Sequence, residues 1–352
     1  MPPLGSRVPR CERGQRDEVA LHEMFERKSY RVAVLVGGAA TVVALILVLG
    51  GQKGFGPQQY GQLIVAGLGA GAIYALIALG FVMVYTVTGI INFAQGAFVM
   101  LGAMIAATLY ASGFGGTGAA GLAVAAIVAI AATAAIGIAV ERLTIFPARN
   151  ADPLTLIIIT VGVYIVLQGL ALIFWGSGAR VLPAFSTLEI ADNTFRPGGI
   201  VIKAQSLWIW GTTAGVLAVL MVFLGRTLLG KALRACSVNK DAARLMGISP
   251  SRMSVFAFGL AAAMGAVAGI VLAPAGRPIY DMGLKLGLKG FVAAAMGGLV
   301  SSPLAVLGGL LLGLTENIVA GVTKSGLRDI FAFIVLIAVL LRRRGLLGRG
   351  LE

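Results

Sequence analysis

Apolar runs separated by short polar segments make up most of this chain. A helix needs about 20 predominantly apolar residues to cross the hydrocarbon core of a membrane. The pattern therefore predicts an all-α, polytopic integral membrane protein with about eight transmembrane helices. The candidate spans are Val32–Leu49, Leu63–Val84, Ile90–Tyr110, Ala119–Val140, Leu154–Trp175, Leu207–Leu224, Val255–Leu272 and Ile330–Leu341.

One further apolar stretch, Leu286–Ile318, is interrupted at Ser301-Ser302-Pro303. Proline lacks a backbone donor and disfavours helix in the residue before it, so the stretch divides into two pieces. These pieces, Leu288–Val300 and Leu304–Leu314, are each too short for a comfortable span. We expect a re-entrant helical hairpin over residues 286–318, which is tolerated where protein surrounds the break.

The basic residues orient the spans. Cytoplasmic loops carry an excess of Lys and Arg, and a cytoplasmic N-terminus places most of the 28 basic residues on the inner side. Arg342–Arg344 join them only if the hairpin enters and leaves by the same face. We expect a basic extension over residues 1–31, a transmembrane domain over 32–341 and a basic tail over 342–352, with both termini cytoplasmic.

The N-terminal extension differs from the rest of the chain. Met1–Glu23 has no apolar run of the length found in a secretory signal peptide, and its composition cannot bury a core. The basic segment Met24–Arg31 is enough to hold the N-terminus inside. We expect that Met24 is the physiological start, or else that Met1–Glu23 is a disordered tail.

Composition narrows the chemistry. Hydrophobic residues are 58% of the chain and charged residues 12%, a balance that a soluble fold could not bury. One histidine, His22, and two distant cysteines, Cys11 and Cys236, exclude a disulfide scaffold, a zinc protein and a His-dependent hydrolase. The net charge of +14 is spread over short loops, so we expect a lipid bilayer and no nucleic acid as partner.

Glycine is abundant, with 50 residues, and several glycines recur at four-residue spacing inside apolar runs. This spacing places bare patches on one helix face and lets backbones approach closely. It indicates close helix packing without specifying a dimer. The pairs are Gly67 and Gly71, Gly265 and Gly269, and Gly309 and Gly313.

The longest polar insertion on the inner side covers residues 226–252. Ser237 is expected to cap a short helix that contains Asp241 and Leu245. Gly247 supplies a left-handed stop, after which Ile248 folds back on the last turn.

The next helix begins with Ser249 as its cap and Pro250 at its first position. The short helix before it would lie across the cytoplasmic face, apolar through Leu245 and Met246 and basic at its edges. It is either a solvated loop or a docking surface for another protein.

Two interrupted segments in opposite halves of the chain point to a transport path. In Thr88–Gly96, we expect Asn92 and Gln95 three apart on one helical face. The other segment is Gly297–Pro303. The amides could hydrogen-bond a polar solute or tie helices together, and both interpretations stay open. The candidate substrate-path residues are Asn92, Gln95, Gly96, Ser301 and Ser302.

Asp241-Ala-Ala followed by Gly247-Ile248 resembles the cytoplasmic coupling loop of bacterial ABC-importer permeases. Asp241 stands where glutamate is often found, which keeps the charge. The resemblance implies a helix that fits a groove in the ATPase subunit. Its residues would be Asp241, Ala242, Ala243, Leu245, Gly247 and Ile248.

A second resemblance covers roughly Gln62–Leu347. Gly71-Ala-Ile-Tyr-Ala-Leu-Ile-Ala-Leu-Gly80, Val87-Thr-Gly-Ile-Ile-Asn-Phe-Ala-Gln-Gly96 and Leu307-Gly-Gly-Leu-Leu-Leu-Gly-Leu-Thr-Glu316 are the main segments. They strongly resemble permeases of the branched-chain amino-acid ABC importer family, particularly the smaller of its two membrane subunits. Ala97 departs from the glutamate of many relatives, so the solute is less determined than the architecture.

The resemblance implies a translocation subunit in the bacterial inner membrane, with branched-chain or other hydrophobic amino acids as solutes. The chain contains no GxxxxGK[ST] phosphate loop, so we expect no enzyme activity and no cofactor in this chain. The implied partners are two cytoplasmic ABC ATPase subunits that bind ATP, a second permease subunit, identical or different, and an extracytoplasmic solute-binding protein.

Two alternatives remain at this point. One is an ABC permease for urea, amides or small carboxylates. The other is an ion-coupled secondary carrier, which the scarcity of charged residues within the spans disfavours. Lys285, Lys289 and Glu316 are expected at the outer ends of the hairpin rather than in mid-membrane.

Overall fold

The computed structural model describes residues 55–116, 118–149, 151–185, 194–195, 199–323, 326 and 328–337. The chain divides into Met1–Gly56 and Pro57–Glu352, and every element below belongs to the second unit. The predicted span Val32–Leu49, the extension 1–31 and the tail 342–352 lie outside the described residues.

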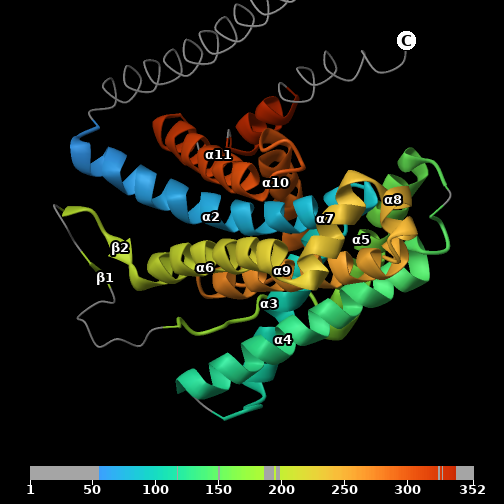
Figure 1. Cartoon of the computed structure of the whole chain (residues 1–352). Coiled ribbons are helices and arrows are strands. Elements are labelled where there is room, and N and C mark those ends of the chain that lie inside the picture. The colour runs from blue at the N-terminus through green and yellow to red at the C-terminus, as the bar shows by residue number, and fades with distance from the viewer. Residues whose placement is uncertain are drawn as a thin grey trace, which may run out of the picture. The chain divides into compact units, whose positions relative to one another are not determined.

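The second unit is built from helices (Figure 1), which confirms the all-α prediction. A two-residue antiparallel ladder, β1 (Thr194–Phe195) with β2 (Ile202–Lys203), is the exception among the described residues. Residues 328–337 are also helical. The labelled helices are α2 (Pro57–Thr88), α3 (Gln95–Ala111), α4 (Gly118–Val140) with its π-helical continuation η1 (Glu141–Ile145), α5 (Pro153–Trp175), α6 (Ala204–Arg226), α7 (Leu228–Val238), α8 (Lys240–Leu245), α9 (Pro250–Gly276), α10 (Met282–Met296) and α11 (Ser302–Val322).

Six of the described helices are long and apolar enough to cross a membrane: α2, α4 with η1, α5, α6, α9 and α11. Five of them contain a predicted span, so the apolar pattern located them correctly. The predicted run Ile90–Tyr110 instead becomes helical at Gln95. Gly89, at φ 77°, ends the preceding helix, and the side chain of Asn92 accepts a hydrogen bond from the Ala94 backbone in the connecting turn.

The interrupted stretch forms a helix–turn–helix hairpin of α10 and α11, which pack against each other. The prediction of two short pieces is wrong for the second one, because α11 has 21 residues. Pro303 lies in its first turn, where proline is tolerated. The polar residues near its end do not stop it, since Thr315 and Asn317 hydrogen-bond carbonyls of their own helix. Whether the hairpin is re-entrant stays a prediction.

Helix α2 is the centre of the unit and packs against α11 and α10 on one side and α9 and α6 on the other (Figure 1). Its middle is almost completely buried, as in Leu76 and Ile77. In contrast, α5 and α6 expose large apolar side chains such as Ile173 (78% exposed) and Val219 (69% exposed). This outer apolar surface suits lipid as the solvent.

The glycine pairs are the points where helices come closest. Gly67 and Gly71 of α2 face Leu314, Leu310 and Gly309 of α11, so that an added Cβ would lie 2.8 Å from a backbone atom at each position. Gly269 of α9 likewise faces the backbone of Val99 in α3. The predicted close packing is therefore confirmed, and it occurs between helices of the same chain.

Candidate functional site

Helix α8 is short, and hydrogen bonds at its two ends fix where it begins and stops. At its start, the Asn239 side chain accepts hydrogen bonds from the backbone of Asp241 (2.9 Å) and Ala242 (3.0 Å). The predicted cap, Ser237, is wrong, because α7 continues through Val238 and the Ser237 hydroxyl donates back to the Arg234 carbonyl. Asparagine is an equally good cap residue, so the helix begins two residues later than expected.

The end of α8 agrees with the prediction. Gly247 has a φ of 79°, and its backbone N–H donates to the Arg244 carbonyl at 3.0 Å. The N–H of Ile248 donates to the Ala243 carbonyl at 3.0 Å, and its side chain packs against the buried core. This is a Schellman-type stop. Ser249 then occupies the cap position of α9 without a side-chain cap bond.

Helix α8 is anchored on one face and open on the other. Ala243 is buried, whereas Leu245 is 90% and Met246 81% exposed. An exposed ion pair joins Asp241 and Arg244 at 3.1 Å. Leu245 and Met246 therefore present two adjacent, largely exposed apolar side chains at the end of α8.

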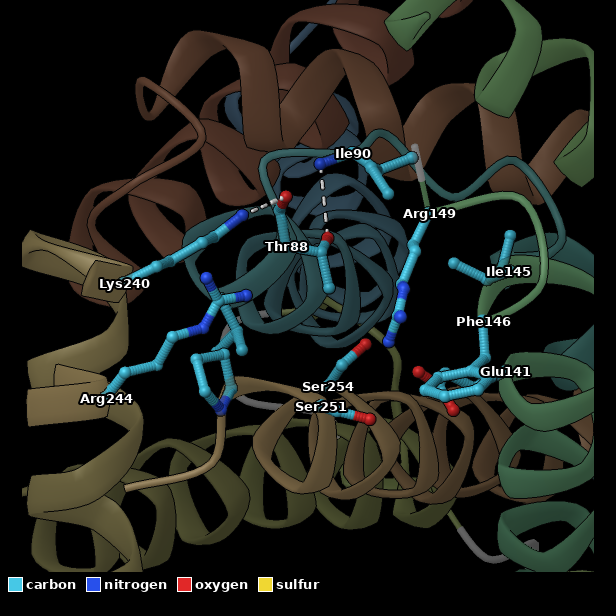
Figure 2. Close-up of a pocket in the computed structure, with 12 residues that line it drawn as sticks. Thr88, Ile90, Glu141, Ile145, Phe146, Arg149, Lys240, Arg244, Ser251 and Ser254 are labelled. Carbon is cyan, nitrogen blue, oxygen red and sulfur yellow. Dashed lines mark hydrogen bonds between the residues drawn. The ribbon is translucent and has the colours of Figure 1, made fainter. Parts of the chain in front are cut away.

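A cavity of about 390 Å³ lies beside α8 (Figure 2) and connects it to three other elements. Lys240 donates to the carbonyl of Thr88, the last residue of α2, at 2.8 Å. Glu141 enters from the start of η1, Arg149 from the turn that follows η1, and Ser254 from the first turns of α9 (Figure 2). Helix α8 thus contacts the end of α2 through the Lys240 hydrogen bond and also packs against α9. We call this space the coupling cavity.

The predicted substrate-path residues of the first segment are buried between helices. Gln95 is fully buried and its Nε2 donates to the Ala261 carbonyl of α9 at 2.9 Å. Gly96 lies against Gly283 of α10, where an added Cβ would be 2.2 Å from the carbonyl oxygen. Asn92 lies in the turn before α3, so the expectation that it shares a helical face with Gln95 is wrong.

Two buried amide atoms in this region, Asn92 Nδ2 and Gln95 Oε1, have no hydrogen-bond partner among the described residues. The interhelical bond of Gln95 shows a structural role for its nitrogen. A role of either amide in a substrate path stays a prediction.

Ser301 and Ser302 line a different cavity of about 410 Å³, together with Arg234 and Ser237 of α7 and Thr86 near the end of α2. The lining of this cavity does not include Asn92 or Gln95. The structure therefore does not bring the two interrupted segments together in one space. It places the tip of the α10–α11 hairpin beside α7 instead.

A cluster of charged residues lies inside the helix bundle, and the sequence pattern did not predict it as a site. Lys289 lies in the middle of α10 and Glu316 inside α11, not at the ends of the hairpin as predicted. The physical reason is that they neutralise each other, with Lys289 Nζ 2.6 Å from Glu316 Oε1. The signal in the sequence was their symmetrical position on either side of the predicted turn.

Three further residues complete this charge cluster. Arg328 Nε lies 2.5 Å from Glu316 Oε1, and the Tyr74 hydroxyl donates to the same oxygen at 3.3 Å. Asp329 pairs with Lys289 at 2.7 Å. Glu316 is fully buried, so removal of both Lys289 and Arg328 would leave its carboxylate unpaired away from water, which is strongly destabilising. Within the described part of the chain, no group of His, Cys, Asp and Glu could hold a metal ion.

No solved structure gives a significant match. The chain is 37% identical over 295 residues to the high-affinity branched-chain amino acid transport system permease protein BraD of Pseudomonas aeruginosa, covering 82% of this chain and 96% of that protein. It is 35% identical over 295 residues to the permease LivH of Escherichia coli K12, covering 82% and 95%.

A more distant relative is the probable branched-chain amino acid transport permease LivH of Methanocaldococcus jannaschii, 27% identical over 257 residues and covering 70% of this chain and 77% of that protein. The family model described as "Branched-chain amino acid transport system / permease component" matches residues 63–340. That range contains every helix from α3 to α11 and most of α2. The chain is therefore a multi-pass membrane permease and belongs to the permease component family of branched-chain amino acid transport systems.

Proposed function

We propose that this chain is the translocation subunit of a binding-protein-dependent ABC importer for branched-chain or other hydrophobic amino acids in a bacterial inner membrane. The similarity to branched-chain amino acid transport permeases supports the solute class. In this proposal ATP is bound and hydrolysed by two cytoplasmic ATPase subunits, not by this chain. A second permease subunit and an extracytoplasmic solute-binding protein complete the transporter.

The observation that carries the proposal is the construction of α8. A transport subunit without its own ATPase needs a surface that receives motion from another protein. Leu245 and Met246 project from a capped, ordered helix, where they are available to fill an apolar groove. The buried Ala243 and the Lys240 bond to Thr88 tie that helix to the bundle. Movement imposed on α8 therefore reaches α2 and α9, whose packing defines the bundle core.

The substrate path in this proposal follows the two interrupted segments. Asn92, Gln95 and Gly96 line it at the α3–α9–α10 contact, and Ser301 and Ser302 at the hairpin tip. Support comes from the two unpartnered buried amide atoms, because a buried polar group without a partner is costly and a passing polar solute would satisfy it. Neutral amides would do so without placing a fixed charge in the passage.

The experiment replaces the two exposed residues of α8. A Leu245→Ser, Met246→Ser double variant is assembled with the partner subunits, and L-leucine uptake driven by ATP is measured in proteoliposomes. We expect loss of ATPase association and uptake with normal membrane insertion. Leu228→Ser, at an 85% exposed position at the start of α7, is the matched control and should transport normally.

Solute identity is tested in the same preparation with a panel of L-leucine, urea, an amide and a small carboxylate. Uptake of leucine with no uptake of the other solutes supports the proposal. Uptake of urea or carboxylate in preference to leucine would show that the proposed solute class is wrong. Uptake without ATP in the presence of an ion gradient would show that the transporter is an ion-coupled carrier and not an ABC importer.

A further inference from the structure

The charge cluster described above borders a cavity of about 360 Å³ at the end of the bundle opposite to α8. The coupling cavity is lined by the first turn of α9, and this second cavity by the last turns, through Leu272 and Gly276. Along α9 the nearest lining residues of the two cavities are Ser254 and Leu272, which lie about 27 Å apart at 1.5 Å per residue. With α8 on the cytoplasmic side, this charged cavity opens to the outer side and reaches Tyr74 in the middle of α2.

The walls of the charged cavity differ in character. One part is apolar and includes Ile73, Leu272 and Leu286. The other part carries both signs of charge, with Lys285, Lys289 and Arg328 as cations and Asp281 as an exposed carboxylate. Ligand pockets are mostly apolar with a few convergent polar groups, and this volume is at the small end of their range.

The hydrogen bonds of Glu316 are distributed unevenly. Lys289, Arg328 and Tyr74 all direct their donors to Oε1, whereas the buried Oε2 has no hydrogen-bond partner among the described residues. A cluster that served only to hold the helices together would be expected to satisfy both oxygens. The arrangement instead fixes the two cations, Lys289 and Arg328, at the cavity wall.

The ion pair between Asp329 and Lys289 shows that the Lys289 ammonium can bind a carboxylate that is partly exposed to water. Its carboxylate lies 2.7 Å from Lys289 Nζ, and its side chain is 51% exposed, in contrast to the fully buried Glu316. An ion pair with one partner in water is weak and exchangeable, while the pair with Glu316 is held inside the protein. Asp329 therefore occupies a carboxylate position that an incoming carboxylate can take over.

We propose that the charged cavity is a binding site for a zwitterionic amino acid with an apolar side chain. The ligand's carboxylate replaces Asp329 on Lys289, with Lys285 and Arg328 beside it. Its ammonium group faces Asp281 at the cavity mouth, and its side chain rests on the wall formed by Ile73, Leu272 and Leu286. The inference rests on the proposed function, to which it adds a defined site on the outer side of this chain.

The first test is protection of a cavity cysteine in the transporter assembled with its partner subunits. Leu286→Cys, in a Cys11→Ser, Cys236→Ala background, reports from the cavity wall. We expect L-leucine to slow its maleimide labelling about tenfold at about ten times the Kd. Leucinamide lacks the carboxylate and glycine lacks the apolar side chain, so neither should protect. Leu284→Cys, on the same helix but outside the cavity lining, should label at one rate throughout.

Two charge variants separate ligand binding from a purely structural role. Asp329→Asn releases Lys289 from its competitor, so protection by leucine should appear at lower concentration. A purely structural ion pair predicts no such gain. The triple variant Lys289→Gln, Glu316→Gln, Arg328→Gln removes the buried carboxylate together with the two cations that pair with it, so none of the three charges is left without its partner. It should assemble with the ATPase subunits and lose protection.

The outcomes also separate this inference from the proposed function. Leucine import by the unmodified transporter together with an unchanged Leu286→Cys labelling rate would overturn the inference alone. Equal protection by leucinamide or glycine would also overturn it. Protection by leucine in a transporter that does not import leucine would support the site and contradict the proposed function.

Discussion

Gly71 of α2 and Gly313 of α11 lie so close that a methyl group on Gly313 would be 2.3 Å from the Gly71 Cα atom. No side chain other than hydrogen fits at this contact. The rigid backbone cannot move aside as the end of a flexible side chain would. The α2–α11 contact, which holds the hairpin on the central helix, therefore depends on these two glycines.

Gly313→Ala should lower stability. Overpacking of a close contact costs about 1–3 kcal/mol, so the thermal midpoint of the purified protein in detergent should fall by several degrees. Gly162→Ala on α5 is the matched control, since an added Cβ there meets nothing within 4 Å. Tryptophan fluorescence during heating measures both. Equal midpoints for the two variants would contradict the packing described here.

Gly247→Val should uncouple transport without preventing membrane insertion. The φ of 79° is unfavourable for a β-branched residue, at a cost of about 1–2 kcal/mol, while an added Cβ would meet no atom within 4 Å. The effect is thus conformational and not steric. Gly247→Asn, which tolerates this region, should retain most uptake. If the Val variant transports leucine at the unmodified rate, the left-handed stop is not required.

Cysteine accessibility tests the hairpin. Lys285→Cys lies in the first turn of α10 and Gly326→Cys follows α11. In a chain without Cys11 and Cys236, both should react with an impermeant thiol reagent from outside. Leu245→Cys should react only after the membrane is permeabilised. Labelling of only one of the two hairpin positions from outside would show that the hairpin does not return to the face it entered.

Cys236 should be a slow thiol in the folded protein. Its side chain is buried, and burial raises the pKa of the thiol above its ordinary value of 9.0, with the positive charge of Lys240 acting in the opposite direction. A raised pKa lowers the thiolate fraction at neutral pH, so the maleimide rate should still be increasing above pH 9. Val238→Cys, at an 88% exposed position, is the reactive reference in a Cys236→Ala chain. Equal rates at pH 7 would show that the α7 packing is looser than described.

The apolar pattern predicted the long helices well because a segment in lipid must satisfy its own backbone hydrogen bonds. A run such as Leu154–Trp175 has no alternative to a helix, and α5 covers it with one additional residue at its start. The Gly247 stop was also predictable, since it depends only on local backbone conformation. These features need no information from the rest of the chain.

The sequence predictions that were wrong concern polar residues. In some cases the hydrogen-bonding or charged partner is distant in sequence, and in others a neighbouring residue could fill the same role equally well. Ser237 and Asn239 are both good caps, and the choice was decided by how far α7 continues. Asn92 was placed on a helix, although its side chain caps a turn. Glu316 was placed at a helix end because its partners Lys289 and Arg328 could not be paired with it by spacing alone. Tertiary contact determines each case.

The ion pair of Lys289 and Glu316 also affects how the chain is inserted into the membrane during synthesis. Inserted alone, a helix carrying Lys289 at its centre would bring an unpaired charge into lipid, at a cost of about 2.5–3.5 kcal/mol by translocon scales. Glu316 follows 27 residues later, in the next helix. Biosynthesis is therefore favoured when α10 waits beside the translocon until α11 has emerged, so that Lys289 enters the bilayer already paired with Glu316. The hairpin is in this sense the smallest segment of the chain that contains both members of this buried pair.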